Sequence, residues 1–284
     1  FIFGRSDIYY FGIIFGLLAL SRQWGFLFIL SLLIFLFSMK YFYNDDIFKK
    51  LFKLLFWSLL IAFIISSWFY FGLFIQYGSF TTFNEIPQEL DIKNNPISFY
   101  TTTGFEDLLL FKEPFRGSSM TKGIIPILHS DTWGDWWGYF LLRTGREGES
   151  VNISETLPYL GRVNAVALIP TTLYLLGLLY CFKFLKNGKH KFEKNKELKV
   201  FYFLITIFTV TGFAGFLWFN IKYPEEKGDT VKATYIIYLL NILPFYGALF
   251  LNRIKNFNLK FYKILYSIVF LIFIHNIPTM ITNF

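Results

Sequence analysis

The sequence has few cysteine residues and few charged residues. It contains a single cysteine, Cys181, so no disulfide forms within the chain and no multi-thiolate metal site is available. Only 16% of the 284 residues are charged, against about 25% in soluble domains. These shortages exclude a disulfide-stabilised secreted domain and disfavour an ordinary water-soluble fold.

Apolar residues are abundant instead. They make up 55% of the chain, 39 of them are phenylalanine, and the mean hydropathy is +0.47. A helix of about 20 residues crosses the ~30 Å hydrocarbon core of a bilayer. The pattern predicts an all-α integral membrane protein with about seven transmembrane or membrane-entering helices. We expect these spans at residues 7–20, 24–43, 51–75, 162–185, 198–220, 230–252 and 261–281.

The basic residues predict how these helices are oriented. The net charge is +8, and lysine and arginine gather in three short gaps, near residues 40–53, 183–199 and 253–263. All three gaps fall on one side if the spans alternate, and short basic loops mark the cytoplasmic side. We therefore expect a multi-pass protein of a prokaryotic plasma membrane, with a lipid bilayer and no nucleic acid as partner. It divides into helices in 1–76, an extracytoplasmic loop in 77–160, and further helices in 161–284.

The long segment 77–160 has the composition of a folded region. It contains an apolar stretch at 105–111 and four large aromatic residues, Trp133, Trp136, Trp137 and Tyr139. Disordered segments are poor in aromatic residues, and tryptophan and tyrosine favour the headgroup zone of a bilayer. We expect this loop to contain short helices and to fold against the membrane domain.

The densest group of reactive side chains lies in that loop. His129, Asp131, Trp133 and Asp135 occur within seven residues. The two carboxylates are weak candidates for holding a divalent cation through oxygen, and His129 is a candidate general base. Aromatic rings beside carboxylates also suit sugars. The alternative is a surface loop in which the aspartates cap turns and the tryptophan anchors at the membrane interface.

Two cations near the ends of apolar runs are candidates for binding phosphate. Arg22 separates the first two runs, and its guanidinium either clamps a lipid phosphate or extends to the interface. Lys232 lies in the first turn of the predicted sixth span, where the helix dipole disfavours a cation. It therefore indicates an anionic partner, unless Glu225 or Glu226 neutralises it.

Three stretches, in order, resemble the polyprenyl-phosphate-sugar-dependent glycosyltransferases of the membrane C-type fold. That superfamily includes protein O-mannosyltransferases and aminoarabinose transferases. Residues 12–28 are similar to its glycine-containing helix, basic residue and second helix. Residues 67–80 resemble its exit into an outer loop, without the usual arginine and asparagine. Residues 232–244 resemble its late Lys/Arg-x-Arg-Tyr helix, with Thr234 where arginine is common.

The resemblance implies a site at the extracytoplasmic face. Arg22, Lys232 and Tyr235 would approach the phosphate of a polyprenyl-phosphate sugar donor, with a divalent cation as an optional cofactor. The loop would cover the acceptor, which is a glycan, lipid or protein. The family's catalytic acid lies in an outer loop that nothing here matches. We therefore expect this chain to be a C-terminal portion, with the acid upstream of Phe1.

Two other classes of function fit the same features. One is a transporter or flippase for an anionic lipid-linked substrate, which is expected to have charged or broken helices at mid-membrane. Pro170 and Pro244 are the candidate breaks, but the interiors of the spans contain no acidic residue for ion coupling. The other is a non-catalytic membrane subunit.

Overall fold

A computed structural model describes eight stretches of the chain. These are residues 4–21, 24–42, 45–80, 97–101, 123–134, 153–186, 196–222 and 233–281. The described stretches are almost entirely helical and contain no strand. The all-helical fold class predicted from the apolar runs is confirmed for these residues.

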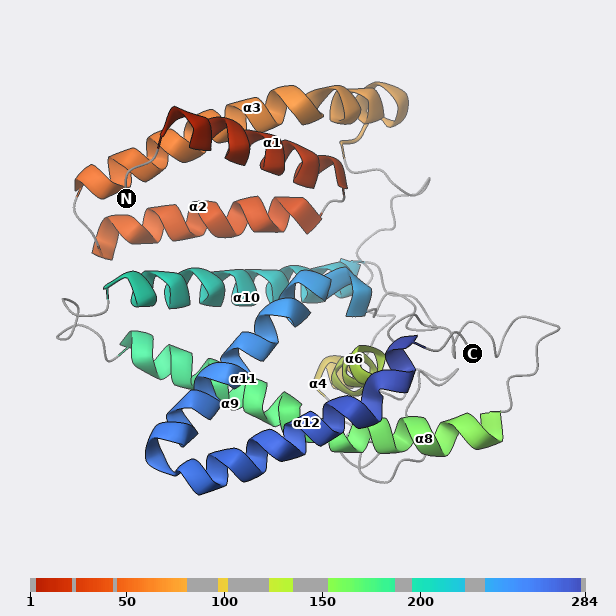
Figure 1. The fold of residues 1–284 in the computed structure, drawn as a ribbon. Helices are drawn as coiled ribbons and strands as arrows, with labels where there is room; N and C mark the ends of the chain where they lie inside the picture. Colours follow the sequence, from red (N-terminus) through yellow and green to blue (C-terminus); the bar gives the residue numbers. More distant parts are fainter. Residues whose placement is uncertain are drawn as a thin grey trace. The chain divides into compact units, whose positions relative to one another are not determined.

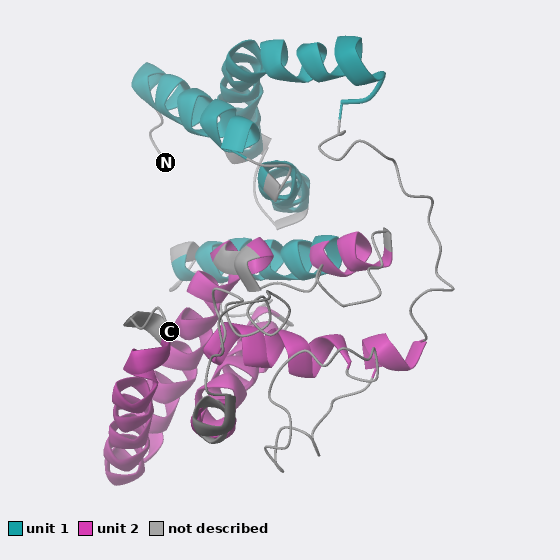
Figure 2. Cartoon of the chain, turned by 90° about the vertical axis from the view of Figure 1, so that its right-hand side faces the viewer, with its two compact units in different colours: residues 1–89, 193–215 teal, residues 90–192, 216–284 magenta. Residues whose placement is uncertain are grey.

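The chain divides into two compact units that do not follow its linear order (Figure 2). Unit 1 contains residues 1–89 and 193–215, and unit 2 contains residues 90–192 and 216–284. One long helix, α10 (Lys196–Lys222), contributes its first part to unit 1 and its last turns to unit 2.

Unit 1 is built on a parallel helix pair. In it, α1 (Arg5–Ser21) lies along α3 (Asp45–Tyr77) (Figure 1). Near the start of α1, Ser58 Oγ donates to Ile8 O at 3.1 Å, and near its end Tyr70 OH donates to Ala19 O. Residue numbers rise in the same direction along both helices, so the pair is parallel. Gly78, at φ +69°, ends α3 in the left-handed region that glycine adopts without strain.

The other two helices of unit 1 run antiparallel to each other. The Phe28 ring in α2 (Trp24–Phe42) stacks on Phe208 of α10 with centroids 4.4 Å apart. Further along, Phe35 lies near Phe203 at 6.0 Å. The end of α2 therefore approaches the beginning of α10. Lys40 in α2 and the start of α10 accordingly lie toward the same end of the unit.

Unit 2 gathers the rest of the described chain. Its helices are α4 (Ile97–Thr101), α6 (Ile124–Trp133), α8 (Ile153–Val166), α9 (Leu168–Lys186), η3 (Ala233–Ile236), α11 (Ile237–Phe257) and α12 (Leu259–Ile281). The closest helix contact is between α9 and α11. A Cβ atom at Gly177 would lie far inside contact distance of Tyr246 O, and one at Gly247 would lie 2.7 Å from the Tyr174 ring.

Four helical stretches are long and apolar enough to cross a membrane: Phe48–Tyr77, Gly161–Leu185, Leu198–Ile221 and Leu259–Thr279. They coincide with four of the predicted spans. The other three predicted spans correspond to the helices α1, α2 and α11. These helices are not among the four stretches that are long and apolar enough to cross a membrane, so seven crossings remain a prediction. Only 17% of the most apolar part of the first stretch is buried. Such outward-facing apolar surface favours a lipid environment.

The region 77–160 contains helix, as predicted. Besides the short α4 and α6, it includes the first part of α8, which begins at Ile153, before the end of the predicted loop. α8 continues into α9 through a single turn residue, Ala167, whose N–H donates to Val163 O and whose carbonyl accepts from Thr171 N, each at 3.1 Å. Pro170 has no N–H to donate to the carbonyl four residues earlier, so one helical hydrogen bond is missing there. The apolar stretch 105–111 and Trp136, Trp137 and Tyr139 lie outside the described residues.

Candidate functional site

The His129 group is buried in α6. His129 is 8% exposed, and Ser130 and Asp131 are each 4% exposed. They share the helix with buried Ile124 and Ile127. The alternative of a surface loop is therefore wrong for these residues. Buried polar side chains require hydrogen-bond partners, and those of His129 and Ser130 come from α8 and α9.

Both nitrogens of the His129 ring are engaged. Nε2 lies 2.9 Å from the backbone oxygen of Asn164 in α8, so it carries the proton and donates. Nδ1 is then the acceptor, and it faces the Thr171 hydroxyl of α9 at 3.5 Å. His129 thus connects α6 with the helices on both sides of Ala167.

Asn164 completes the contact with α8. Its Nδ2 donates to Ser130 Oγ at 2.7 Å, and the residue is 1% exposed. Consecutive residues of α6 therefore bond to one residue of α8, one through the backbone and the other through the side chain. A pair of this kind fixes both the rotation and the position of α6.

Trp133 extends the network along α9. Its Nε1 donates to Thr171 Oγ1 at 3.0 Å, and its ring stacks on Tyr174 with centroids 6.2 Å apart. The backbone oxygen of Trp133 accepts from Thr279 of α12 at 3.4 Å. Since Thr171 accepts from Trp133, its own proton can point to His129 Nδ1, which gives a continuous chain from Trp133 to Asn164.

Burial lowers the pKa of His129, and its hydrogen bond to the Asn164 carbonyl partly opposes that shift. The ring is therefore neutral at pH 7. With both nitrogens occupied, His129 acts as a connector between helices in this arrangement. A role as general base would first require the contact with Thr171 to open.

A second polar group joins α8 to α12. Tyr159 OH donates to the backbone oxygen of His275 at 2.8 Å, and the rings lie 5.5 Å apart. His275 Nδ1 bonds to Asn276 Oδ1 at 2.8 Å within α12. Asn276 is 1% exposed, and within the described chain its Nδ2 has no hydrogen-bond partner. Arg162 lies over the Tyr159 ring at 5.9 Å.

Tyr235 lies in η3, against Phe219 of α10 with ring centroids 5.5 Å apart. The next residue of α10, Asn220, is 1% exposed and accepts at its backbone oxygen from Tyr100 OH at 3.4 Å. The helix α6 itself contacts η3. Two features singled out in the sequence, the His129 group and the Tyr235 turn, are therefore brought together within unit 2.

Three predicted site residues, Arg22, Lys232 and Asp135, lie outside the described part of the chain. Asp131 is described, but the oxygen-ligand pair it would form with Asp135 is not. Within the described stretches, no group of three or more His, Cys, Asp or Glu residues is placed to hold a metal ion.

Sequence reasoning missed the partners of α6. Asn164 and Thr171 lie 34 and 42 positions from the residues that they contact. Both occur next to or inside an apolar span, where a polar residue is expensive unless it is paired. A polar residue in an apolar span is therefore expected to have a hydrogen-bond partner. This expectation could have identified Asn164 and Thr171 from the sequence.

No protein-family model, curated protein or solved structure matches the chain.

Proposed function

We propose that the chain forms part of a membrane glycosyltransferase. It would transfer a sugar from a polyprenyl-phosphate donor to an acceptor at the extracytoplasmic face of a prokaryotic plasma membrane. The observation that supports this most directly is the contact between α6 and η3. It brings α6, which contains His129 and Asp131, into contact with the turn that contains Tyr235, one of the residues that the resemblance assigns to the donor phosphate.

Each part of this site has a chemical role in the proposal. Lys232 and Arg22 neutralise the phosphate that leaves when the sugar is transferred, and Tyr235 donates a hydrogen bond to it. Asp131 accepts hydrogen bonds from sugar or acceptor hydroxyls. The His129 and Trp133 bonds to α8 and α9 hold α6 at the fixed position that such contacts require.

The experiment measures sugar transfer by the full-length protein in proteoliposomes supplied with a polyprenyl-phosphate sugar. Arg22→Ala and Lys232→Ala should each lower the turnover about 100-fold, the typical loss when one transition-state contact is removed. Lys260→Ala removes an exposed cation from the start of α12 and serves as the control. If both variants keep the wild-type rate, the phosphate-binding roles are refuted.

A transporter for the same kind of lipid is the second candidate, because two apolar helical stretches contain a proline, which removes a helical hydrogen bond. Pro170 lies just after the turn residue Ala167, and Pro244 lies inside α11. Broken helices line substrate paths in many transporters. Movement of lipid-linked sugar across liposomes without its transfer to an acceptor would favour this reading. Neither transfer nor movement would favour a non-catalytic membrane subunit.

A further inference from the structure

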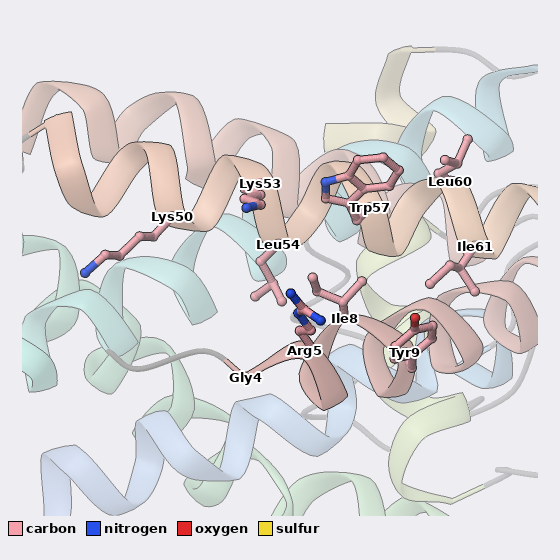
Figure 3. A pocket seen from close by; sticks show the side chains of 10 residues that line it. All are labelled: Gly4, Arg5, Ile8, Tyr9, Lys50, Lys53, Leu54, Trp57, Leu60 and Ile61. Atoms are coloured by element: carbon pink, nitrogen blue, oxygen red, sulfur yellow. The ribbon is translucent and has the colours of Figure 1, made fainter.

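A groove lies between α1 and α3 in unit 1 (Figure 3). Its volume is about 740 Å³. It is lined by Gly4, Arg5, Ile8 and Tyr9 from α1, and by Lys50, Lys53, Leu54, Trp57, Leu60 and Ile61 from α3. The groove opens before the point at which Gly12 and Ile61 bring the two helices into close contact.

The lining changes in character along α3. Lys50 and Lys53 come first, and Trp57, Leu60 and Ile61 follow at spacings of three and four residues, so all lie on one face of the helix. From Lys53 to Leu60 the helix advances about 10 Å. The groove is therefore cationic at one end and apolar at the other, as the binding site of an amphiphile must be.

The cationic end has no acidic residue among its lining. Arg5 points from α1 toward Leu54 and Lys53, and Lys50, a turn earlier on α3, extends away from Arg5 and Lys53 (Figure 3). The nearest carboxylate on α1, that of Asp7, accepts the backbone N–H of Gly4 at 2.8 Å. Asp45 and Asp46 lie at the start of α3, a turn before Lys50. Cations outnumber acids at this end of the unit, because Lys40 and Lys49 lie there too.

The apolar end provides contacts that an inorganic anion would not use. Leu54 is 6% exposed and forms the floor, whereas Trp57 and Leu60 are 45% and 42% exposed. The indole nitrogen of Trp57 faces the Lys53 side of the groove (Figure 3). Tryptophan prefers the boundary between headgroups and acyl chains, where its N–H can donate and its ring remains in apolar surroundings.

We propose that this α1–α3 groove binds one anionic phospholipid of the cytoplasmic leaflet. Arg5, Lys50 and Lys53 hold its phosphate, and an acyl chain lies along Trp57, Leu60 and Ile61. The three cations lie at the basic end of unit 1, which short basic segments assign to the cytoplasmic side. The site is separate from the extracytoplasmic donor site, and it does not depend on whether the chain is a transferase.

The test uses the full-length protein, purified and delipidated in detergent. Dioctanoyl phosphatidylglycerol is titrated by calorimetry, and native mass spectrometry counts the bound molecules. We expect one tightly bound lipid, and weaker binding of dioctanoyl phosphatidylcholine. Each basic residue near an anionic surface contributes about a fivefold gain in affinity, so Lys50→Gln combined with Lys53→Gln should weaken phosphatidylglycerol binding about 25-fold.

The matched control is Lys183→Gln combined with Lys260→Gln. It removes the same charge from exposed positions in unit 2 and should leave the affinity within about twofold of wild type. Thermal melting of both double variants checks that they are folded. Equal affinity for the two lipids, equal losses in the two double variants, or equal binding of inorganic phosphate alone would each overturn the proposal.

Discussion

The two units each use glycine to bring a pair of helices together, and the pair in unit 2 approaches more closely at its glycine. In unit 1, a Cβ atom at Gly12 would lie 2.7 Å from the Cβ atom of Ile61 and 3.1 Å from the backbone oxygen of Ser58. In unit 2, a Cβ atom at Gly177 would lie far inside contact distance of the backbone carbonyl of Tyr246. Neither the Ile61 Cβ atom nor a carbonyl in the middle of a helix moves without its backbone, so we expect an added methyl group to displace the helices of unit 2 further than those of unit 1.

The difference extends to the polar contacts. Unit 1 joins α1 to α3 through hydroxyls that donate to single carbonyls, such as Ser58 to Ile8. Unit 2 uses a connected chain in which Trp133, Thr171, His129 and Asn164 link three helices. Helix α9 takes part in both kinds of contact: Thr171 belongs to the hydrogen-bond chain, and Gly177 lies against α11. Unit 2 therefore has the more rigid construction, which suits a binding site, while unit 1 has the more adaptable one.

The strongest test of this comparison is Gly177→Ala. Its methyl group has no space beside the Tyr246 carbonyl, so α9 and α11 must separate. We expect a loss of more than about 3 kcal/mol in the free energy of unfolding, beyond the usual cost of overpacking. Thermal or denaturant unfolding in mixed micelles measures it.

Gly72→Ala is the matched control for that substitution. Gly72 also lies inside a helix, but a Cβ atom there would meet nothing within 4 Å. Alanine is a better helix former than glycine, so we expect a gain of about 0.5–1 kcal/mol. Comparable losses in the two variants would show that the close contact at Gly177 is not what holds α9 to α11.

A second test addresses the polar chain through pH. The folded pKa of His129 lies below its ordinary value of 6.5 because the ring is buried, so near and below pH 6.5 the unfolded state binds more protons. The contribution of His129 to the free energy of unfolding is fully present above pH 6.5 and decreases as the pH falls through 6.5. Unfolding measured between pH 8 and pH 5.5 should show this loss in wild type.

His129→Gln removes the titrating ring and weakens the bonds to α8 and α9. We expect the substitution to lower the free energy of unfolding by about 2 kcal/mol at pH 8. The difference in this free energy between the variant and wild type should be smaller at pH 5.5. His190→Gln, at a position in the basic segment after α9, is the control and should keep the wild-type profile. An unchanged pH slope in His129→Gln would show that another group causes the acid sensitivity.

A smaller loss than that of Gly177→Ala is expected for Gly12→Ala in unit 1. The methyl group would lie 2.7 Å from Ile61 Cβ and 2.8 Å from Ile61 Cγ2, so the helices must shift slightly, and the gain in helix propensity offsets part of the cost. We expect a net loss of about 1 kcal/mol, measured in the same unfolding assay as Gly177→Ala. A loss as large as that of Gly177→Ala would mean that the two interfaces are equally rigid and would remove the contrast.

The helices were predictable from the sequence because apolar runs of membrane length have few alternatives to helix. Even the limits agree closely for α12, predicted at 261–281 and found at Leu259–Ile281. The position of the first part of α8, before residue 162, was not predicted. It carries Ser154 and Glu155, so it lacks the continuous apolar run by which the other helices were recognised.

The site was only partly predictable for a related reason. The sequence indicated that His129 and Asp131 matter, but not that they are buried, because burial depends on residues far away in the chain. Nor did it indicate how His275 is used: the ring bonds to its neighbour Asn276, and the backbone oxygen makes the link to Tyr159. The roles assigned to three residues remain predictions, because these residues lie outside the described part of the chain: Arg22, Lys232 and Asp135.

The length of α3 has a mechanical consequence for the membrane around it. Its 33 residues extend about 50 Å, whereas the hydrocarbon core measures about 30 Å. The excess places the ends of the helix in the headgroup layers or beyond, or tilts its axis. Because α1 is fixed along α3 by the contacts at Gly12 and Ala19, the pair must tilt as one body when bilayer thickness changes.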